Sequence, residues 1–147
     1  MKAFKNASVY AEGKGIIRTS VYFDDNSRQI GGYVAGAEEI ELPENAVVLP
    51  GFIDEHIHGA GGSDAMDGNT KDLAIIAETV AKEGTTSFLA TTMTQSKENI
   101  LKAMRAVKEY REAAGEQGAR IAGVHLEGPF IAAAHKGAQP LEYVAAP

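Results

Sequence analysis

The sequence contains no cysteine among its 147 residues. Disulfide bonds, zinc–thiolate centres and cysteine nucleophiles are therefore all excluded. Any metal ion that the chain binds must be held by histidine, aspartate or glutamate side chains, and histidine is itself scarce, with four in the whole chain.

Positive charge is also in short supply. Lysine and arginine together number 14 against 20 aspartates and glutamates, which gives a formal net charge of −6. Non-specific binding to nucleic acid or to an anionic membrane rewards clustered basic residues, and no basic stripe occurs, so we expect neither as a partner. No apolar stretch is long enough to span a bilayer, and residues 1–15 lack the apolar core of a signal peptide, so we expect a cytoplasmic protein.

The composition is otherwise that of an ordinary globular protein, with 44% hydrophobic and 23% charged residues. Residues 1–48 contain short β-like segments separated by glycine, asparagine, aspartate and proline, which predicts a small antiparallel sheet. Residues 51–58 form a mostly apolar run that ends in two histidines. After this run the pattern alternates between helix and strand.

Two helices and two further strands are predicted in this second region. Asn69 or Thr70 is a candidate N-cap for the first helix, which Gly84 would end, and Ser96 and Gly115 are the corresponding signals for the second. The predicted elements are a helix over 71–83, a strand over 85–93, a helix over 97–114 and a buried strand over 119–130. Their inner faces are expected to carry Leu73, Ile76, Ala77 and Val80 in the first helix, and Ile100, Leu101, Met104 and Val107 in the second, with the stem of Lys108 at the edge of that face.

The strands begin near residues 52, 86 and 120, a spacing of about one βα unit. This order predicts an α/β fold in which a parallel sheet has right-handed crossover helices. A complete (β/α)₈ barrel takes roughly 250 residues, so the chain would be either a fragment or an unusually short open α/β protein. We expect a fragment.

Polar side chains occur at the carboxyl ends of two of these strands, where active groups of parallel α/β folds gather. His56 and His58 are two residues apart and project to the same side of a strand, and His125 and Glu127 repeat this arrangement. One interpretation is that His56, His58 and Glu127 bind a divalent cation, since imidazole and carboxylate suit zinc, iron, manganese or cobalt. The alternative is that they are polar strand ends, with Glu127 capping backbone N–H groups. We assign His125 to the polar strand ends, where it would form hydrogen bonds, with a role as a further ligand as the alternative.

Two other segments are weaker candidates. The glycine-rich stretch 59–68 could bind phosphate, but it matches neither the P-loop nor the dinucleotide fingerprint, and a strand-to-helix connection explains it better. His135 and Lys136 lie after the third strand and could contact an anionic substrate, or could be part of a solvated basic loop.

Four segments together resemble a known family. LPGFIDEHIHG (49–59), GTTSFLATT (84–92), GVHLEGPF (123–130) and KGAQP (136–140) are similar to segments of the N-acetylglucosamine-6-phosphate deacetylases of the amidohydrolase superfamily. HLEGPF is the most specific of them. The resemblance covers essentially the whole chain but only about the first two-fifths of a family member.

The resemblance implies a metal-bearing (β/α)₈ TIM barrel beside a small β-sandwich, with residues 1–48 forming part of the sandwich and residues 49–147 the N-terminal part of the barrel. It implies hydrolysis of N-acetylglucosamine 6-phosphate, a small-molecule amino-sugar phosphate, to acetate and glucosamine 6-phosphate. The metal would be Zn²⁺ or Fe²⁺, one or two ions per site, and the complete protein a homodimer.

The resemblance also implies roles for individual residues. Glu127 matches the family's metal-binding glutamate, and His56 and His58 match the first-strand pair found in two-metal members. Ala138 and Gln139 match a substrate-contacting pair, although the family usually has histidine at the second position. The proton-donating aspartate and two further histidine ligands are expected beyond residue 147, so this chain alone would be inactive. A dihydroorotase- or deaminase-like amidohydrolase and a non-catalytic metal-binding module are the alternatives.

Overall fold

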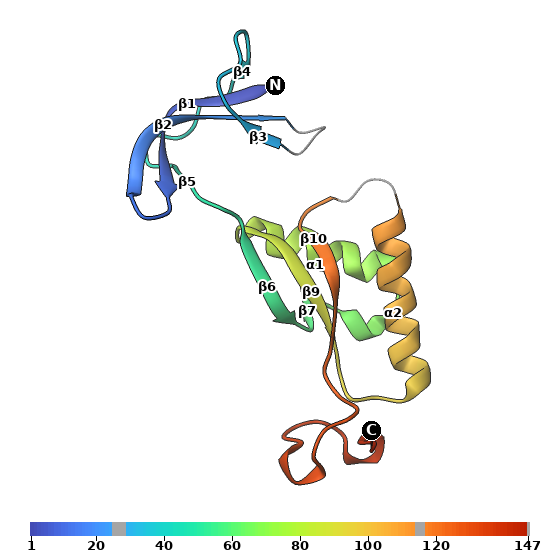
Figure 1. Cartoon of the computed structure of the whole chain (residues 1–147). Helices are drawn as coiled ribbons and strands as arrows, with labels where there is room; N and C mark the ends of the chain where they lie inside the picture. Colours follow the sequence, from blue (N-terminus) through green and yellow to red (C-terminus); the bar gives the residue numbers. More distant parts are fainter. Residues whose placement is uncertain (25–28, 114–116, 147) are drawn as a thin grey trace. The chain divides into compact units, whose positions relative to one another are not determined.

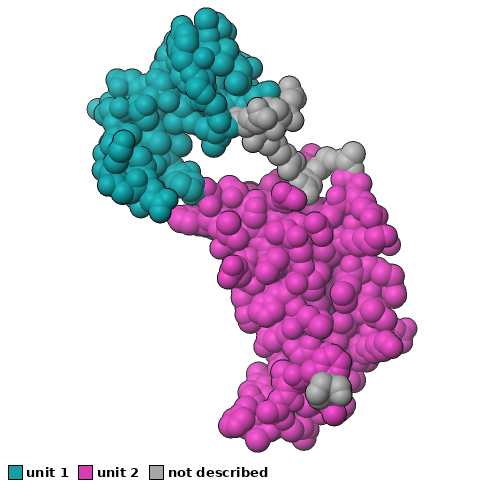
Figure 2. All heavy atoms as spheres, viewed as in Figure 1, with its two compact units in different colours: residues 1–50 teal, residues 51–147 magenta. Residues whose placement is uncertain are grey.

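The computed structural model of the chain describes residues 1–24, 29–113 and 117–146. The chain divides into two compact units, Met1–Pro50 and Gly51–Pro147, which are coloured separately in Figure 2. This division falls two residues after the boundary expected from the sequence. The assignment of the units to a sandwich and a barrel stays a prediction.

The first unit is a five-stranded sheet of mixed direction. β1 (Lys2–Ala11) pairs with β2 (Gly15–Asp24) in an antiparallel hairpin, and β3 (Gln29–Gly31) extends β2, also antiparallel. β4 (Glu38–Glu39) and β5 (Val47–Val48) both pair with β1 in parallel. The prediction of an antiparallel sheet is therefore wrong for part of this unit. β4 and β5 pair with the edge of β1 that β2 leaves open, and both run in the same direction as β1.

The second unit contains a three-stranded parallel sheet with two helices (Figure 1). Its strands are β6 (Phe52–Ile57), β9 (Thr85–Thr92) and β10 (Arg120–Leu126), in the order β10-β9-β6. Helix α1 (Thr70–Lys82) connects β6 to β9, and α2 (Lys97–Glu112) connects β9 to β10. The strand–helix alternation predicted from the sequence is confirmed. The shorter elements are the hairpin β7 (Gly59–Ala60) and β8 (Ser63–Asp64) and the 3₁₀ turns η1 (Ala65–Asp67), η2 (Ala133–His135) and η3 (Leu141–Tyr143).

Both helices begin at the predicted caps. The Asn69 side chain accepts a hydrogen bond from the Asp72 N–H (3.0 Å), and Ser96 accepts one from the Asn99 N–H (3.3 Å). These bonds satisfy backbone donors that the first helical turn leaves without a partner. α1 ends before Gly84, whose φ of +90° suits a residue without a side chain. The predicted stop of α2, Gly115, lies outside the described residues.

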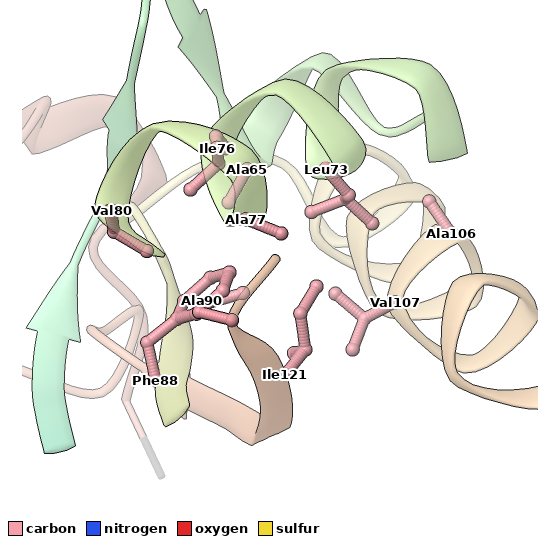
Figure 3. Packing of buried hydrophobic residues seen from close by; sticks show 11 residues of the cluster. Ala65, Leu73, Ile76, Ala77, Val80, Phe88, Ala90, Ala106, Val107 and Ile121 are labelled. Atoms are coloured by element: carbon pink, nitrogen blue, oxygen red, sulfur yellow. The ribbon is translucent and has the colours of Figure 1, made fainter. Parts of the chain in front are cut away.

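The core lies between the two helices and one face of the sheet (Figure 3). The predicted inner face of α1 is confirmed, since all four of its apolar residues are buried. Phe88 of the central strand β9 and Ile121 of the neighbouring strand β10 are fully buried in the same cluster. The unit is thus held together by packing on the face of the sheet that carries the helices.

The predicted inner face of α2 is only partly correct. Ile100 and Val107 are buried, but Leu101 and Met104 are 39% and 40% exposed. Ala103 and Ala106 are buried instead. The buried face of α2 is therefore lined by Ile100, Val107 and two alanines, and the larger side chains of Leu101 and Met104 lie on an adjacent, partly exposed face. Lys108 is exposed along with Leu101 and Met104.

The third strand is shorter than predicted, because β10 ends at Leu126 rather than continuing to residue 130. Gly128 has a φ of +77°, which an extended strand cannot accommodate. Glu127 is consequently the first residue of the loop that follows β10. Among the described residues, no helix is long and apolar enough to cross a membrane.

Candidate metal centre

His56, His58 and Glu127 come together at the carboxyl ends of β6 and β10. His56 lies within β6, His58 directly follows that strand, and Glu127 directly follows β10. The pairing of β6 with β9 is irregular between Asp54 and Ile57, and the Asp54 carboxylate accepts a hydrogen bond from the His56 N–H (3.0 Å). Such irregularities re-aim side chains and are common beside active sites.

The three side chains converge on one carboxylate oxygen. Oε2 of Glu127 lies 2.9 Å from Nε2 of His56 and 3.0 Å from Nε2 of His58. The donor atoms of all three lie within 4.8 Å of one another. Side-chain exposures of 51%, 34% and 30% for His56, His58 and Glu127 leave the cluster open to solvent on one side.

This donor set fits a divalent transition metal. Two ligand atoms each about 2.0–2.1 Å from a tetrahedral zinc ion lie roughly 3.3 Å apart, and here Oε2 of Glu127 lies 2.9 and 3.0 Å from the two histidine nitrogens. Two imidazoles and one carboxylate suit zinc, iron, manganese or cobalt. The open side leaves room for water or a substrate oxygen.

The tautomer of His58 is set by a backbone carbonyl. Nδ1 of His58 lies 3.2 Å from the carbonyl oxygen of Thr91, at the end of β9. A carbonyl only accepts, so Nδ1 carries a hydrogen, and in the neutral ring Nε2 is left with a lone pair. That lone pair faces Oε2 of Glu127, which is also an acceptor. A cation between the two atoms, either a proton or a metal ion, is required to make this contact favourable.

Glu127 is itself held by two residues. Gln139 donates from Nε2 to Oε1 of Glu127 (2.7 Å), and the Thr94 hydroxyl donates to the Glu127 backbone carbonyl (3.3 Å). Burial acts to raise the pKa of the Glu127 carboxyl, but the hydrogen bonds from Gln139 and His56 and the attraction of both histidines outweigh it, so the pKa lies below its usual range. The carboxylate therefore stays ionised and available as a ligand near neutral pH.

His125 has the hydrogen-bonding role expected from the sequence. Its Nδ1 donates to the backbone carbonyl of Glu55 (3.1 Å), which ties β10 to β6 across the end of the sheet. Its ring also packs edge-on against that of His56, with 4.5 Å between ring centroids. His125 supports the position of His56 and is not one of the three converging donors.

The predicted substrate-contacting residues lie in the loop after β10, between η2 and η3. Ala138 is exposed, whereas Gln139 is buried with 7% of its surface exposed. Both polar atoms of the Gln139 amide bind within the chain, since Oε1 accepts from the Thr94 N–H (2.9 Å). Lys136 donates from Nζ to the backbone carbonyls of Gly137 and Gln139 (3.1 and 2.9 Å), so its ammonium group is hydrogen-bonded within its own loop.

The glycine-rich stretch 59–68 forms the β7–β8 hairpin and η1, in keeping with its interpretation as a strand-to-helix connection. Asp64 caps η1 by accepting from the Met66 N–H (2.8 Å), and Asp67 accepts from the Asp64 N–H (2.8 Å). Sequence reasoning did not identify Thr91 and Thr94 as part of the site. The signal was present in TTMT (91–94), where polar residues stand at the end of a buried strand.

The sequence matches the Amidohydrolase family over residues 47–145. It is 46% identical over 110 residues to N-acetylglucosamine-6-phosphate deacetylase of Bacillus subtilis, an alignment covering 74% of this chain and 28% of that protein. It is 34% identical over 126 residues to N-acetylgalactosamine-6-phosphate deacetylase of Escherichia coli O157:H7, covering 82% of this chain and 33% of the relative.

Solved structures show the same relationship. The chain superimposes on the crystal structure of N-acetylglucosamine-6-phosphate deacetylase from Thermotoga maritima with a TM-score of 0.79 and 29% identity, covering 99% of this chain and 37% of that one. The mixed α/β fold thus matches part of a deacetylase, and the chain spans between 28% and 37% of the length of these three relatives. On the strength of the family match and of the converging donors, the chain belongs to the amidohydrolase family.

Proposed function

We propose that this chain provides the first part of the active site of a metal-dependent deacetylase that acts on N-acetylated hexosamine 6-phosphates. The observation that carries the proposal is the convergence of Nε2 of His56 and of His58 on Oε2 of Glu127. The names of the relatives, which include both a glucosamine and a galactosamine enzyme, support the substrate class and favour deacetylation over a dihydroorotase- or deaminase-like reaction.

An amide is a poor electrophile, and its hydrolysis requires a polarised carbonyl, a strong nucleophile and a proton for the leaving amine. A divalent metal, when bound, polarises a carbonyl and lowers the pKa of water. His56, His58 and Glu127 would hold that metal, with the Thr91 carbonyl keeping the His58 ring in the tautomer that presents Nε2. Gln139 and Thr94 would keep the Glu127 carboxylate in place.

Several finer points belong to the same proposal. The metal is Zn²⁺ or Fe²⁺, with one or two ions per site, and the loop residues Ala138 and Gln139 contact the substrate. The aspartate that protonates the leaving amine and two further histidine ligands have no match within residues 1–147, so we expect these residues alone to bind metal without releasing acetate. The complete enzyme would be a cytoplasmic homodimer.

A chimera tests the proposed function. Residues 1–147 would replace the corresponding segment of the Bacillus subtilis deacetylase, which is 46% identical over the aligned region. The chimera should release acetate from N-acetylglucosamine 6-phosphate, lose this activity on treatment with a chelator, and lose it in the Glu127→Ala form. The matched variant Glu55→Ala removes a neighbouring exposed carboxylate and should keep the activity.

The proposal would be overturned by a folded chimera that binds zinc and releases no acetate. That result would favour the alternative in which the chain is a metal-binding module without catalytic capacity. Full activity in the Glu127→Ala chimera would show that the proposed metal centre is not needed for the reaction.

A further inference from the structure

Gln139 bridges two strand ends through its side-chain amide. Its Oε1 accepts from the backbone N–H of Thr94 (2.9 Å), just after β9, and its Nε2 donates to Oε1 of Glu127 (2.7 Å), just after β10. The side chain is buried, with 7% of its surface exposed. A buried amide that has one partner on each side has little freedom to rotate or to exchange partners with water.

The direction of the Gln139 amide is fixed by its partners. The Thr94 N–H is a donor and can be matched only by the amide oxygen, so the NH₂ group must point toward Glu127. This NH₂ group donates its hydrogen bond to Oε1 of the Glu127 carboxylate. Oε2 is therefore the oxygen presented to Nε2 of His56 and of His58, at 2.9 and 3.0 Å.

The same threonine also holds the backbone of Glu127. The Thr94 hydroxyl donates to the Glu127 carbonyl (3.3 Å), so Thr94, Glu127 and Gln139 form a closed ring of three hydrogen bonds. Gln139 is anchored in turn, because its own backbone carbonyl accepts from Nζ of Lys136 (2.9 Å). Neither the backbone nor the side chain of Glu127 can turn without breaking a bond in this ring.

We propose that Gln139 is a positioning residue for the metal centre, which it serves by orienting the Glu127 carboxylate so that Oε2 faces the two histidines. This inference rests on the proposed metal-binding role of His56, His58 and Glu127, and it gives Gln139 a task in addition to the proposed substrate contact. Partners outside the ligand set that orient a metal-binding carboxylate raise metal affinity by holding the ligand in its bound position.

The test is a zinc titration of the 147-residue chain against a chelating dye. Gln139→Met is similar in length and removes both hydrogen bonds, and its Kd for zinc should rise by roughly 10- to 100-fold. Gln139→His retains one donor and one acceptor and should stay within about threefold of the original. Gln117→Met makes the same chemical change at an exposed position and serves as the matched control, with an unchanged Kd.

Two further readouts separate positioning from loss of fold. Thermal unfolding in the presence of a chelator reports whether each variant is folded without metal, and the visible absorption bands of bound Co²⁺ should shift in Gln139→Met. If that variant does not fold, Gln139→Asn replaces it, because its shorter side chain keeps the amide but cannot span from Thr94 to Glu127, and its Kd should rise in the same way.

The outcomes distinguish this inference from the function on which it rests. Failure of the unaltered chain to bind zinc contradicts the metal centre itself. Zinc binding by the unaltered chain with an equal Kd in folded Gln139→Met overturns the positioning role alone. A Kd for Gln139→His as weak as that of Gln139→Met would also count against it, because the hydrogen-bonding pattern would then not be what sets the affinity.

Discussion

Glu127→Ala should abolish zinc binding at the cluster of His56, His58 and Glu127. Glu127 supplies the only carboxylate oxygen in the described cluster, and both histidine Nε2 atoms converge on it. The loss of affinity should exceed the roughly 10- to 100-fold that changes outside a ligand set cost, since a ligand and its negative charge are both removed. The measurement is the Kd for zinc, together with the zinc content of the purified protein by elemental analysis.

Two controls accompany this substitution. Glu55 lies in β6 next to His56, and its side chain is exposed and outside the cluster. The Glu55→Ala variant should therefore bind zinc with unchanged affinity. Glu127→Gln keeps the shape of the side chain but loses the charge, and it should bind zinc weakly. Zinc content unaffected by Glu127→Ala would contradict the assignment of Glu127 as a ligand.

Gly128→Ala should destabilise the second unit by about 2–5 kcal/mol. Gly128 has a φ of +77°, which disfavours any residue with a Cβ, at a cost of roughly 1–2 kcal/mol. A Cβ at this position would also lie only 1.9 Å from the Thr94 hydroxyl oxygen, well inside van der Waals contact. Thr94 is fully buried and cannot move aside freely, and overpacking of this kind adds about 1–3 kcal/mol.

Gly137→Ala separates the cost of the positive φ from the cost of the clash with Thr94. Gly137 also has a positive φ, of +59°, but a Cβ added there would have no other atom within 4 Å. Its substitution should cost only the backbone contribution of about 1–2 kcal/mol. Urea unfolding of both variants gives the comparison, and equal losses of stability would show that the Thr94 contact does not constrain Gly128. Zinc binding should weaken in Gly128→Ala alone, because displacement of Thr94 releases Glu127.

The sequence was sufficient to predict the parts of the fold that local chemistry determines. The Ser96 cap and the buried face of α1 follow from residue type and helical spacing, and both are confirmed. The inner face of α2 was harder to predict, because Leu101 and Met104 are more hydrophobic than the alanines that are buried in this helix. Which of two neighbouring helix faces is buried depends on how the helix packs against the rest of the unit, and local sequence does not determine that packing.

The direction of the short strands in the first unit was also beyond local reasoning. β4 and β5 contain two residues each, and their pairing with β1 depends on the path of the loops between them. The prediction of antiparallel pairing followed from the shortness of the segments and their turn residues. Such residues indicate where a chain turns but not which edge it returns to.

For the candidate site, strand periodicity and residue type identified the three donors but not what holds them. His56 and His58 share a side of β6 by their spacing. The bonds from Gln139 to Glu127 and to Thr94 join residues 12 and 45 positions apart. No local pattern predicts such bonds, which require the loop after β10 to fold back over the end of the sheet. The tautomer of His58 likewise depends on a carbonyl 33 residues away.

The proposed metal centre requires His56, His58 and Glu127 to hold one divalent cation between them. Anomalous diffraction at the zinc absorption edge, from crystals of the chain grown with zinc, locates that cation without reference to activity. We expect a peak about 2.0–2.2 Å from Nε2 of both histidines and from Oε2 of Glu127, with Nδ1 of His58 still bonded to the Thr91 carbonyl. A fully occupied zinc peak elsewhere with none at this cluster, or coordination by His58 through Nδ1, would contradict it.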